Sequence, residues 1–179
     1  MSDLYKVSVD GTFEKWMHGA MYAGIDFSPG GNYIMISTIE RPFSYLVPYN
    51  RFPSVTKVYT SDGVEVETIV EVPLIEDLPK GFMAVRKGRR IAGWRNDLPA
   101  SIVFAEALDG GNPANEVEYR DAVFQLDAPF EQVPKLLLKT FNRFSGVRWG
   151  NEKVAIASDY WWNTRNTKTY LFNPSDPGE

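Results

Sequence analysis

The chain has 179 residues, of which 44% are hydrophobic and 14% aromatic, enough apolar material for the core of one globular domain. Its net charge of −4 weighs against nucleic-acid binding, which favours a basic face, and no apolar run is long enough to span a membrane. The lack of cysteine excludes disulfides and thiolate chemistry but leaves the cellular compartment open.

The N-terminal residues have the pattern of a β-hairpin. Apolar and polar side chains alternate over residues 4–9 and 12–16, on either side of Asp10-Gly11. We expect residues 1–22 to be the outer hairpin of a sheet whose inner strands lie upstream. Because an alternating strand begins almost at Met1, with no signal-peptide pattern, we expect a segment of a longer protein. A periplasmic or secreted parent is compatible with the sequence, and the compartment stays undetermined.

A complete sheet is expected between residues 23 and 78. The turn from Ser28 to Asn32 contains proline and two glycines, and Ser61-Asp62-Gly63 marks a second turn. A long loop that is rich in aromatic residues, 42–53, separates the two hairpins, and long loops often line functional openings. The predicted strands are 24–27, 33–39, 55–60 and 64–72.

A third sheet is expected over residues 79–141 and a fourth, incomplete one over residues 142–179. The predicted strands of the third are 90–94, 102–107, 122–126 and 136–141. Those of the fourth are 146–149, 154–160 and 167–172. Almost no segment has the 3.6-residue periodicity of a helix, so the fold class predicted here is all-β.

Three segments repeat one unit, a short strand that ends in an aromatic residue, a polar turn and a second strand. They are residues 24–37, 90–107 and 146–158, and their aromatic anchors are Phe27, Trp94 and Trp149. Short-strand repeats of about 40–50 residues are typical of four-stranded antiparallel β-propeller blades. A propeller has about 4–8 blades, and this chain has length for about three. A small independent β-barrel or sandwich is the alternative.

Three stretches carry a resemblance to a known family. FSPGGNYIMIS, from Phe27, resembles an element that recurs in propellers of prolyl-oligopeptidase-family serine peptidases. IAGWRNDLPASIVFAEALDGGN and FSGVRWGNEKVAIASDYWWNTRNTKTYLFNPSDP resemble the propeller of the glutamyl endopeptidase branch, found in bacteria and plastids. The likeness runs from about Leu4 to Pro177 and departs at Gly30, where the common turn has Asp.

The resemblance implies a propeller that gates peptide substrates for an α/β-hydrolase domain of the same parent chain. That hydrolase domain would carry the Ser-Asp-His triad. This chain has no G-x-S-x-G nucleophile elbow and a single histidine, His18, so we expect it to be inactive alone, with no catalytic residues, metal ligands or cofactor. The alternative function is a stand-alone propeller-type module that binds proteins or carbohydrates.

Four residues are candidates for substrate binding. The basic run 86–90 is most simply a solvated turn, and the functional interpretation is an anion site in which Arg95, after the predicted inner strand, pairs with a substrate carboxylate. Trp161, Trp162 and Arg165 lie in the densest aromatic stretch, which fits either packing between blades or a surface that faces substrate.

Two further expectations concern the loops and the ends of the chain. The loop from Asp109 to Asn112 lacks the spacing of a calcium-binding loop, so we expect a solvated turn. A truncated array of blades exposes apolar faces, so we expect the isolated chain to self-associate, with its N-terminal hairpin completing a partner's unfinished sheet.

Overall fold

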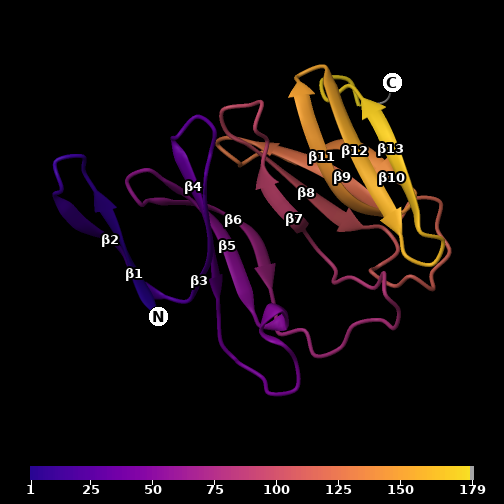
Figure 1. Cartoon of the computed structure of the whole chain (residues 1–179), viewed down its shortest axis with the longest axis horizontal. Coiled ribbons are helices and arrows are strands. Elements are labelled where there is room, and N and C mark those ends of the chain that lie inside the picture. Colours follow the sequence, from indigo (N-terminus) through magenta and orange to yellow (C-terminus); the bar gives the residue numbers. More distant parts are fainter. Residues whose placement is uncertain (178–179) are drawn as a thin grey trace. The chain divides into compact units, whose positions relative to one another are not determined.

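The computed structural model describes residues 1–177, and in them the chain is all-β, as the sequence predicts. The strands are β1 to β13, and the one helical element of the described residues is a 3-10 turn, Tyr49–Arg51. All strand pairs are antiparallel and join neighbours in sequence, so each sheet is an up-and-down meander (Figure 1). The chain divides into two compact units, residues 1–76 and the residues from 77 onward, which are described separately here.

The first unit opens with a two-stranded hairpin, β1 (Ser2–Val7) and β2 (Phe13–Ala20). Its turn has Gly11 in the left-handed region, at φ 86°, a conformation that glycine adopts without steric cost. The Asp10 carboxylate accepts hydrogen bonds from the backbone amide and the hydroxyl of Thr12. The hairpin that Asp10-Gly11 predicts is therefore confirmed.

A four-stranded sheet completes the first unit, in the order β3-β4-β5-β6. Its strands are β3 (Tyr22–Phe27), β4 (Tyr33–Ile39), β5 (Ser54–Thr60) and β6 (Glu65–Val72). Ile34, Ile36, Val58 and Ile69 are at most 6% exposed and form its core. Strand β4 begins and ends where the apolar run predicts, and the 3-10 turn in the aromatic loop was not anticipated.

The second unit holds two sheets. One is four-stranded, with β7 (Arg90–Trp94), β8 (Ser101–Ala107), β9 (Asp121–Asp127) and β10 (Lys135–Thr140). The other is three-stranded, with β11 (Arg143–Asn151), β12 (Val154–Trp161) and β13 (Asn166–Phe172). A buried cluster packs the two sheets together, because it draws side chains from both: Val103, Ala105, Val123, Leu137, Phe144, Ala155, Ala157 and Phe172.

The four sheets thus contain two, four, four and three strands in chain order. Two of them have the four strands of a propeller blade, whereas the first and last are shorter. Their assembly into a propeller stays a prediction. None of the helices in residues 1–177 is long and apolar enough to cross a membrane.

Candidate functional site

Three of the four predicted site residues lie at the end of β12 or in the turn to β13: Trp161, Trp162 and Arg165. The Arg165 guanidinium lies 3.6 Å from the ring centroid of Trp162, and its Nη1 donates a hydrogen bond to the Tyr160 hydroxyl at 3.3 Å. The other contact of Trp162 is with Phe82, at 5.0 Å between ring centroids. Phe82 is 80% exposed and Trp162 is 37% exposed, so this stack lies at the surface.

Trp161 faces a different cation. Its ring centroid lies 4.1 Å from the Arg120 guanidinium, whose Nη1 also donates to the buried Asp109 carboxylate at 2.9 Å. Trp161 is half-buried, in keeping with this packing. Of the two neighbouring tryptophans, Trp162 therefore presents the more accessible surface.

A third cation–aromatic pair lies at the start of β13. The Lys168 ammonium is 4.0 Å from the ring centroid of Phe141, which is 40% exposed and follows β10 directly. Phe141 also stacks on Tyr119, with 4.9 Å between ring centroids. All three pairs lie where strands of the second unit end or begin. We call Phe82, Phe141, Trp161, Trp162, Arg165 and Lys168 the aromatic rim.

Arg95, the fourth predicted residue, lies apart from the others at the end of β7 and is 2% exposed. Its guanidinium donates to both carboxylate oxygens of Asp97, at 3.0 and 2.6 Å, and to the side-chain oxygen of Gln125. The Trp149 ring centroid lies 4.0 Å away. Because these partners already engage the guanidinium, the geometry favours a structural role for Arg95 over capture of a substrate carboxylate.

Two residues of the loop after β8, Asp109 and Gly111, are buried, which corrects the expectation of a solvated turn for Asp109. The Asp109 side chain is fully buried and accepts hydrogen bonds from Arg120 and from Arg143 Nη2, the latter at 2.7 Å. It also accepts from the Gly111 amide at 2.9 Å. Asp109 is neutralised by these arginines, since a buried carboxylate needs charged or hydrogen-bonding partners.

The basic run before β7 is also less solvated than a surface turn. Arg90 is 8% exposed, and its Nη2 lies 2.7 Å from Asp121 Oδ1. Asp121 in turn accepts from Arg143 Nη1 at 3.0 Å. Burial lowers the pKa of Arg86, the first residue of the run, with a further contribution from the charge of Arg90. Arg90 is therefore part of the packing between strands.

A second buried carboxylate, Asp159, holds the backbone of β13 next to Lys168 of the rim. Asp159 is fully buried and accepts hydrogen bonds from the Asn142 amide at 2.9 Å, from the Lys168 amide at 3.2 Å and from the Tyr170 hydroxyl at 2.5 Å. Burial, followed by this hydrogen bond to Asp159, raises the pKa of Tyr170 well above its ordinary value. The backbone that presents Lys168 is thus held by a buried acceptor.

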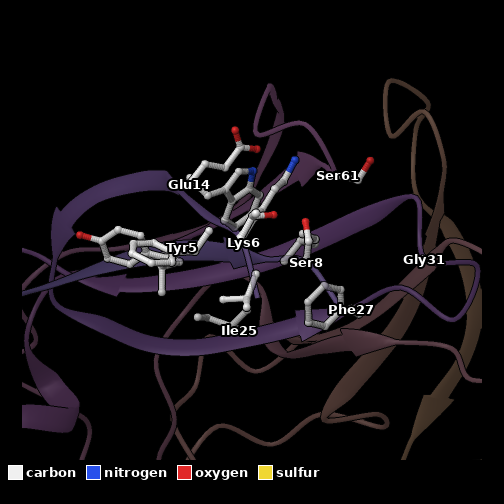
Figure 2. A pocket seen from close by; sticks show the side chains of 14 residues that line it. Tyr5, Lys6, Ser8, Glu14, Ile25, Phe27, Gly31 and Ser61 are labelled. Carbon is white, nitrogen blue, oxygen red and sulfur yellow. The ribbon is translucent and has the colours of Figure 1, made fainter. Parts of the chain in front are cut away.

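The first unit contains a groove of about 910 Å³ (Figure 2). One side is formed by the hairpin residues Tyr5, Phe13 and Trp16, and the other by Ile25 and Phe27 of β3. Phe13 is 72% exposed and Phe27 is 63% exposed, so the groove is apolar and open. The buried indole nitrogen of Trp16 has no hydrogen-bond partner among the described residues.

The single histidine lies on the hairpin of the first unit. His18 is exposed on β2, and its backbone carbonyl accepts a hydrogen bond from the Tyr22 hydroxyl at 2.6 Å. In residues 1–177 no group of three or more His, Asp or Glu side chains could hold a metal ion. The rim presents aromatic rings and cations, and the groove presents apolar side chains.

These features define an all-β chain with an exposed aromatic rim and an open apolar groove. The chain is 39% identical over 175 residues to "Probable glutamyl endopeptidase, chloroplastic" of Oryza sativa subsp. japonica. It is 37% identical over 175 residues to the protein of that name from Arabidopsis thaliana. Both alignments take in 97% of this chain, but only 19% and 18% of the relatives. The chain therefore spans about a fifth of the length of the curated relatives that it matches.

Two other comparisons bear on the fold. No protein-family model matches the chain. A crystal structure of an uncharacterized protein from Listeria monocytogenes EGD-e matches with a TM-score of 0.53, over 97% of this chain and 44% of that one. At 10% sequence identity, this likeness concerns the fold alone.

Sequence reasoning missed part of the rim. Phe82 lies in an irregular segment far from the tryptophans in sequence, and nothing in the local pattern links it to Trp162. For Phe141 and Lys168 the sequence gives only a weak indication of a site, since each lies at or next to the end of a predicted strand. Arg120 lies in the polar loop before β9, and its contact with Trp161 depends on how the two sheets of the second unit pack against each other.

Proposed function

We propose that this chain is a non-catalytic segment of a larger serine peptidase. It helps to admit and orient peptide substrates for a separate α/β-hydrolase domain of the same protein. The observation that carries the proposal is the 39% identity over 97% of the chain to a far longer protein named as a glutamyl endopeptidase. The sequence supports the non-catalytic assignment, since it has no G-x-S-x-G motif and one histidine.

In this proposal the sheets are consecutive blades of a β-propeller of the prolyl-oligopeptidase type. The antiparallel meanders of four strands, β3–β6 and β7–β10, support it. The hairpin β1–β2 and the sheet β11–β13 correspond to incomplete blades. The predicted divisions are at residues 22/23, 78/79 and 141/142, and the first of them falls after the first residue of β3.

The rim is the best candidate for contact with the peptide. Trp161, Trp162 and Arg165 lie together, and the exposed Trp162–Arg165 stack offers both an apolar face and a cation. Arg95 acts in this proposal by fixing the end of β7 through Asp97. Its contribution to substrate binding is indirect.

The proposal is tested in the longer protein that contains this segment. A fluorophosphonate probe, which labels the nucleophilic serine of serine hydrolases, should modify one serine outside residues 1–179. Deleting the segment should relax the size limit on substrates, because a gate excludes large polypeptides more than short peptides. Retention of that limit after deletion would contradict the gating role, and labelling of a serine inside the segment would contradict its non-catalytic assignment.

A further inference from the structure

Three arginines of the second unit share two buried carboxylates. Arg90 Nη2 and Arg143 Nη1 lie 2.7 and 3.0 Å from the same oxygen of Asp121, Oδ1. Arg143 Nη2 and Arg120 Nη1 lie 2.7 and 2.9 Å from the same oxygen of Asp109, Oδ2. No other carboxylate in residues 1–177 forms an ion pair with these arginines. The positive charge of this group therefore exceeds its negative charge.

Arg86 adds a further cation to the same group. Its side chain is half-buried, and its guanidinium donates hydrogen bonds to the backbone carbonyls of Lys87, at 3.0 Å, and of Arg89. Burial lowers the pKa of Arg86, and the charge of Arg90 lowers it further, so the two guanidinium groups are close enough to repel each other. No carboxylate of the described residues forms an ion pair with Arg86. We call Arg86, Arg90, Arg120 and Arg143, with Asp109 and Asp121, the arginine cluster.

Arg90 also has donor groups that the protein leaves without an acceptor. The residue is 8% exposed, and its Nε and Nη2 atoms make no hydrogen bond within residues 1–177, although Nη2 is in ion-pair contact with Asp121. A buried N–H group without an acceptor costs free energy, and the cost is larger when the group is charged. A bound anion would satisfy these donors and reduce the repulsion between Arg86 and Arg90.

The loops beside the cluster limit the size of a ligand. The Val85 amide donates to the Gly111 carbonyl at 3.0 Å, and a Cβ on Gly111 would lie 2.0 Å from the Val85 oxygen. The two loops are therefore in close contact next to Arg86. Lys87 is exposed, and its Cε lies 3.9 Å from the position of a Cβ on Gly110, so a further cation stands on the solvent side. A small anion, or the small charged end of a larger molecule, suits these surroundings.

A phosphate group matches both the charge and the donors of the cluster. Four guanidinium groups accompany two carboxylates, and a phosphate monoester carries a charge of about −1.5 to −2 at pH 7. Arginine presents several N–H donors in one plane and binds phosphate oxygens through paired hydrogen bonds. A single carboxylate has one charge and two oxygens, so it would leave about half of the excess positive charge in place.

We propose that the arginine cluster is a phosphate-binding site, in which Arg86 and Arg90 bind the phosphate oxygens and Lys87 stands at the entrance. Arg143, held by both buried carboxylates, fixes the surroundings of Arg90. This proposal goes beyond the proposed peptidase role, because it involves no residue of the aromatic rim and no peptide. Inorganic phosphate and the phosphate group of a larger molecule share this chemistry, and the experiment separates them.

The test is a titration of the 179-residue chain with inorganic phosphate at pH 7 and constant ionic strength, read by isothermal calorimetry and by the thermal unfolding midpoint. We expect saturable binding, at least about tenfold tighter than that of acetate, and a midpoint that rises with phosphate concentration. Phenyl phosphate is the second probe. If it binds as tightly as inorganic phosphate, the site takes the phosphate group of a larger molecule. If it does not bind, the site takes the free ion, and both results support the proposal.

Three variants locate the site. Arg86→Met should weaken phosphate binding by about tenfold or more, because a charged donor is lost. We expect this variant to fold, since no carboxylate loses a partner and the repulsion of Arg90 is removed. Lys87→Gln should weaken binding by about threefold. Arg148→Met is the matched control, an exposed arginine on β11, and should leave binding unchanged.

The proposal is overturned if phosphate neither binds nor raises the unfolding midpoint above its value in sodium chloride of the same ionic strength. Equal phosphate affinity of Arg86→Met and Arg148→Met also overturns it, as does binding of acetate as tight as that of phosphate. If Arg86→Met does not fold, unchanged phosphate affinity of Lys87→Gln overturns the proposal instead. Serine labelling in the longer protein is independent of these outcomes, so the two proposals fail separately.

Discussion

Arg143 and Asp121 form a buried ion pair that joins β11 to β9, with 3.0 Å between Arg143 Nη1 and Asp121 Oδ1. Their side chains are 4% and 0% exposed. The second Asp121 oxygen accepts from the Phe144 amide at 2.9 Å, and Arg143 also donates to the Met83 carbonyl and to Asp109. Arg143 thus bridges two buried carboxylates between the sheets of the second unit, and each of them also pairs with another arginine, Asp109 with Arg120 and Asp121 with Arg90.

Replacing Arg143 by Met should lower the free energy of unfolding by about 1.5–3 kcal/mol, because Asp109 and Asp121 would each lose one charged hydrogen-bond partner and keep one arginine. Urea denaturation followed by tryptophan fluorescence measures the change. Arg148→Met is the matched control, an exposed arginine on the same strand, and should alter stability by no more than about 0.5 kcal/mol. Equal effects of the two substitutions would contradict the role assigned to the network.

Glycine 111 is required by both its conformation and its surroundings. Its φ is 80°, and a Cβ there would lie 2.0 Å from the backbone oxygen of Val85. Gly31 has a similar φ of 74°, with nothing within 4 Å of its Cβ position.

Gly31→Ala should therefore cost about 1 kcal/mol, from the backbone conformation alone. Gly111→Ala should cost clearly more, since the contact with Val85 forces the loop to move. Thermal unfolding of the two variants side by side measures the difference. If Gly111→Ala were as mild as Gly31→Ala, the tight approach of this loop to Val85 would be disproved.

Stability should fall at high pH, with Tyr170 contributing to the loss. The pKa of Tyr170 is raised in the folded chain, whereas in the unfolded chain the pKa of a tyrosine is about 10. The stabilisation is complete below the unfolded pKa and is lost as the pH rises toward the folded pKa, because the unfolded tyrosine ionises first.

The measurement is the unfolding free energy as a function of pH, for the unaltered chain and for Tyr170→Phe. The pKa values of Tyr22, Tyr59 and Tyr119 are also raised, so the difference between the two curves isolates Tyr170. The variant should lose less stability above about pH 10. Parallel curves would show that the environment of Tyr170 does not favour its neutral form.

The open groove of the first unit predicts self-association of the isolated chain (Figure 2). Phe27 is 63% exposed in its wall, and exposed apolar surface of this kind promotes contact with other chains. Phe27→Asp should shift the chain toward monomer in sedimentation velocity at several concentrations. Val133→Asp, at a 92% exposed position outside the groove, is the control. A strictly monomeric unaltered chain at high concentration would contradict this prediction.

Much of the strand pattern could be predicted from local signals. The Asp10-Gly11 and Ser61-Asp62-Gly63 turns separate alternating runs, and β1–β2 and β5–β6 form on either side of them. Strands β4 and β7 have the predicted bounds, because each is a short, largely apolar run with turn residues next to it. Periodicity and turn chemistry act over a few residues, which is the range that a single sequence reveals.

The candidate site was less predictable, because it depends on side-chain contacts between segments that lie far apart in the sequence. Trp162 and Arg165 share one turn and were found together, whereas Phe82 reaches Trp162 from about eighty positions earlier. The burial of Arg95 and Asp109 was missed for the same reason. Their partners, Gln125 and Arg143, belong to other strands, and a charged residue looks solvated until such a partner is known.

The most direct test of the central claim is active-site labelling of the longer protein with a fluorophosphonate probe, followed by mapping of the modified serine and assay of the separate 179-residue chain. The account predicts one labelled serine outside residues 1–179, and no hydrolysis of Glu-containing peptides by the separate chain. Labelling of a serine within the segment, or peptide hydrolysis by the chain alone, would contradict the claim that it is a non-catalytic part of a larger peptidase.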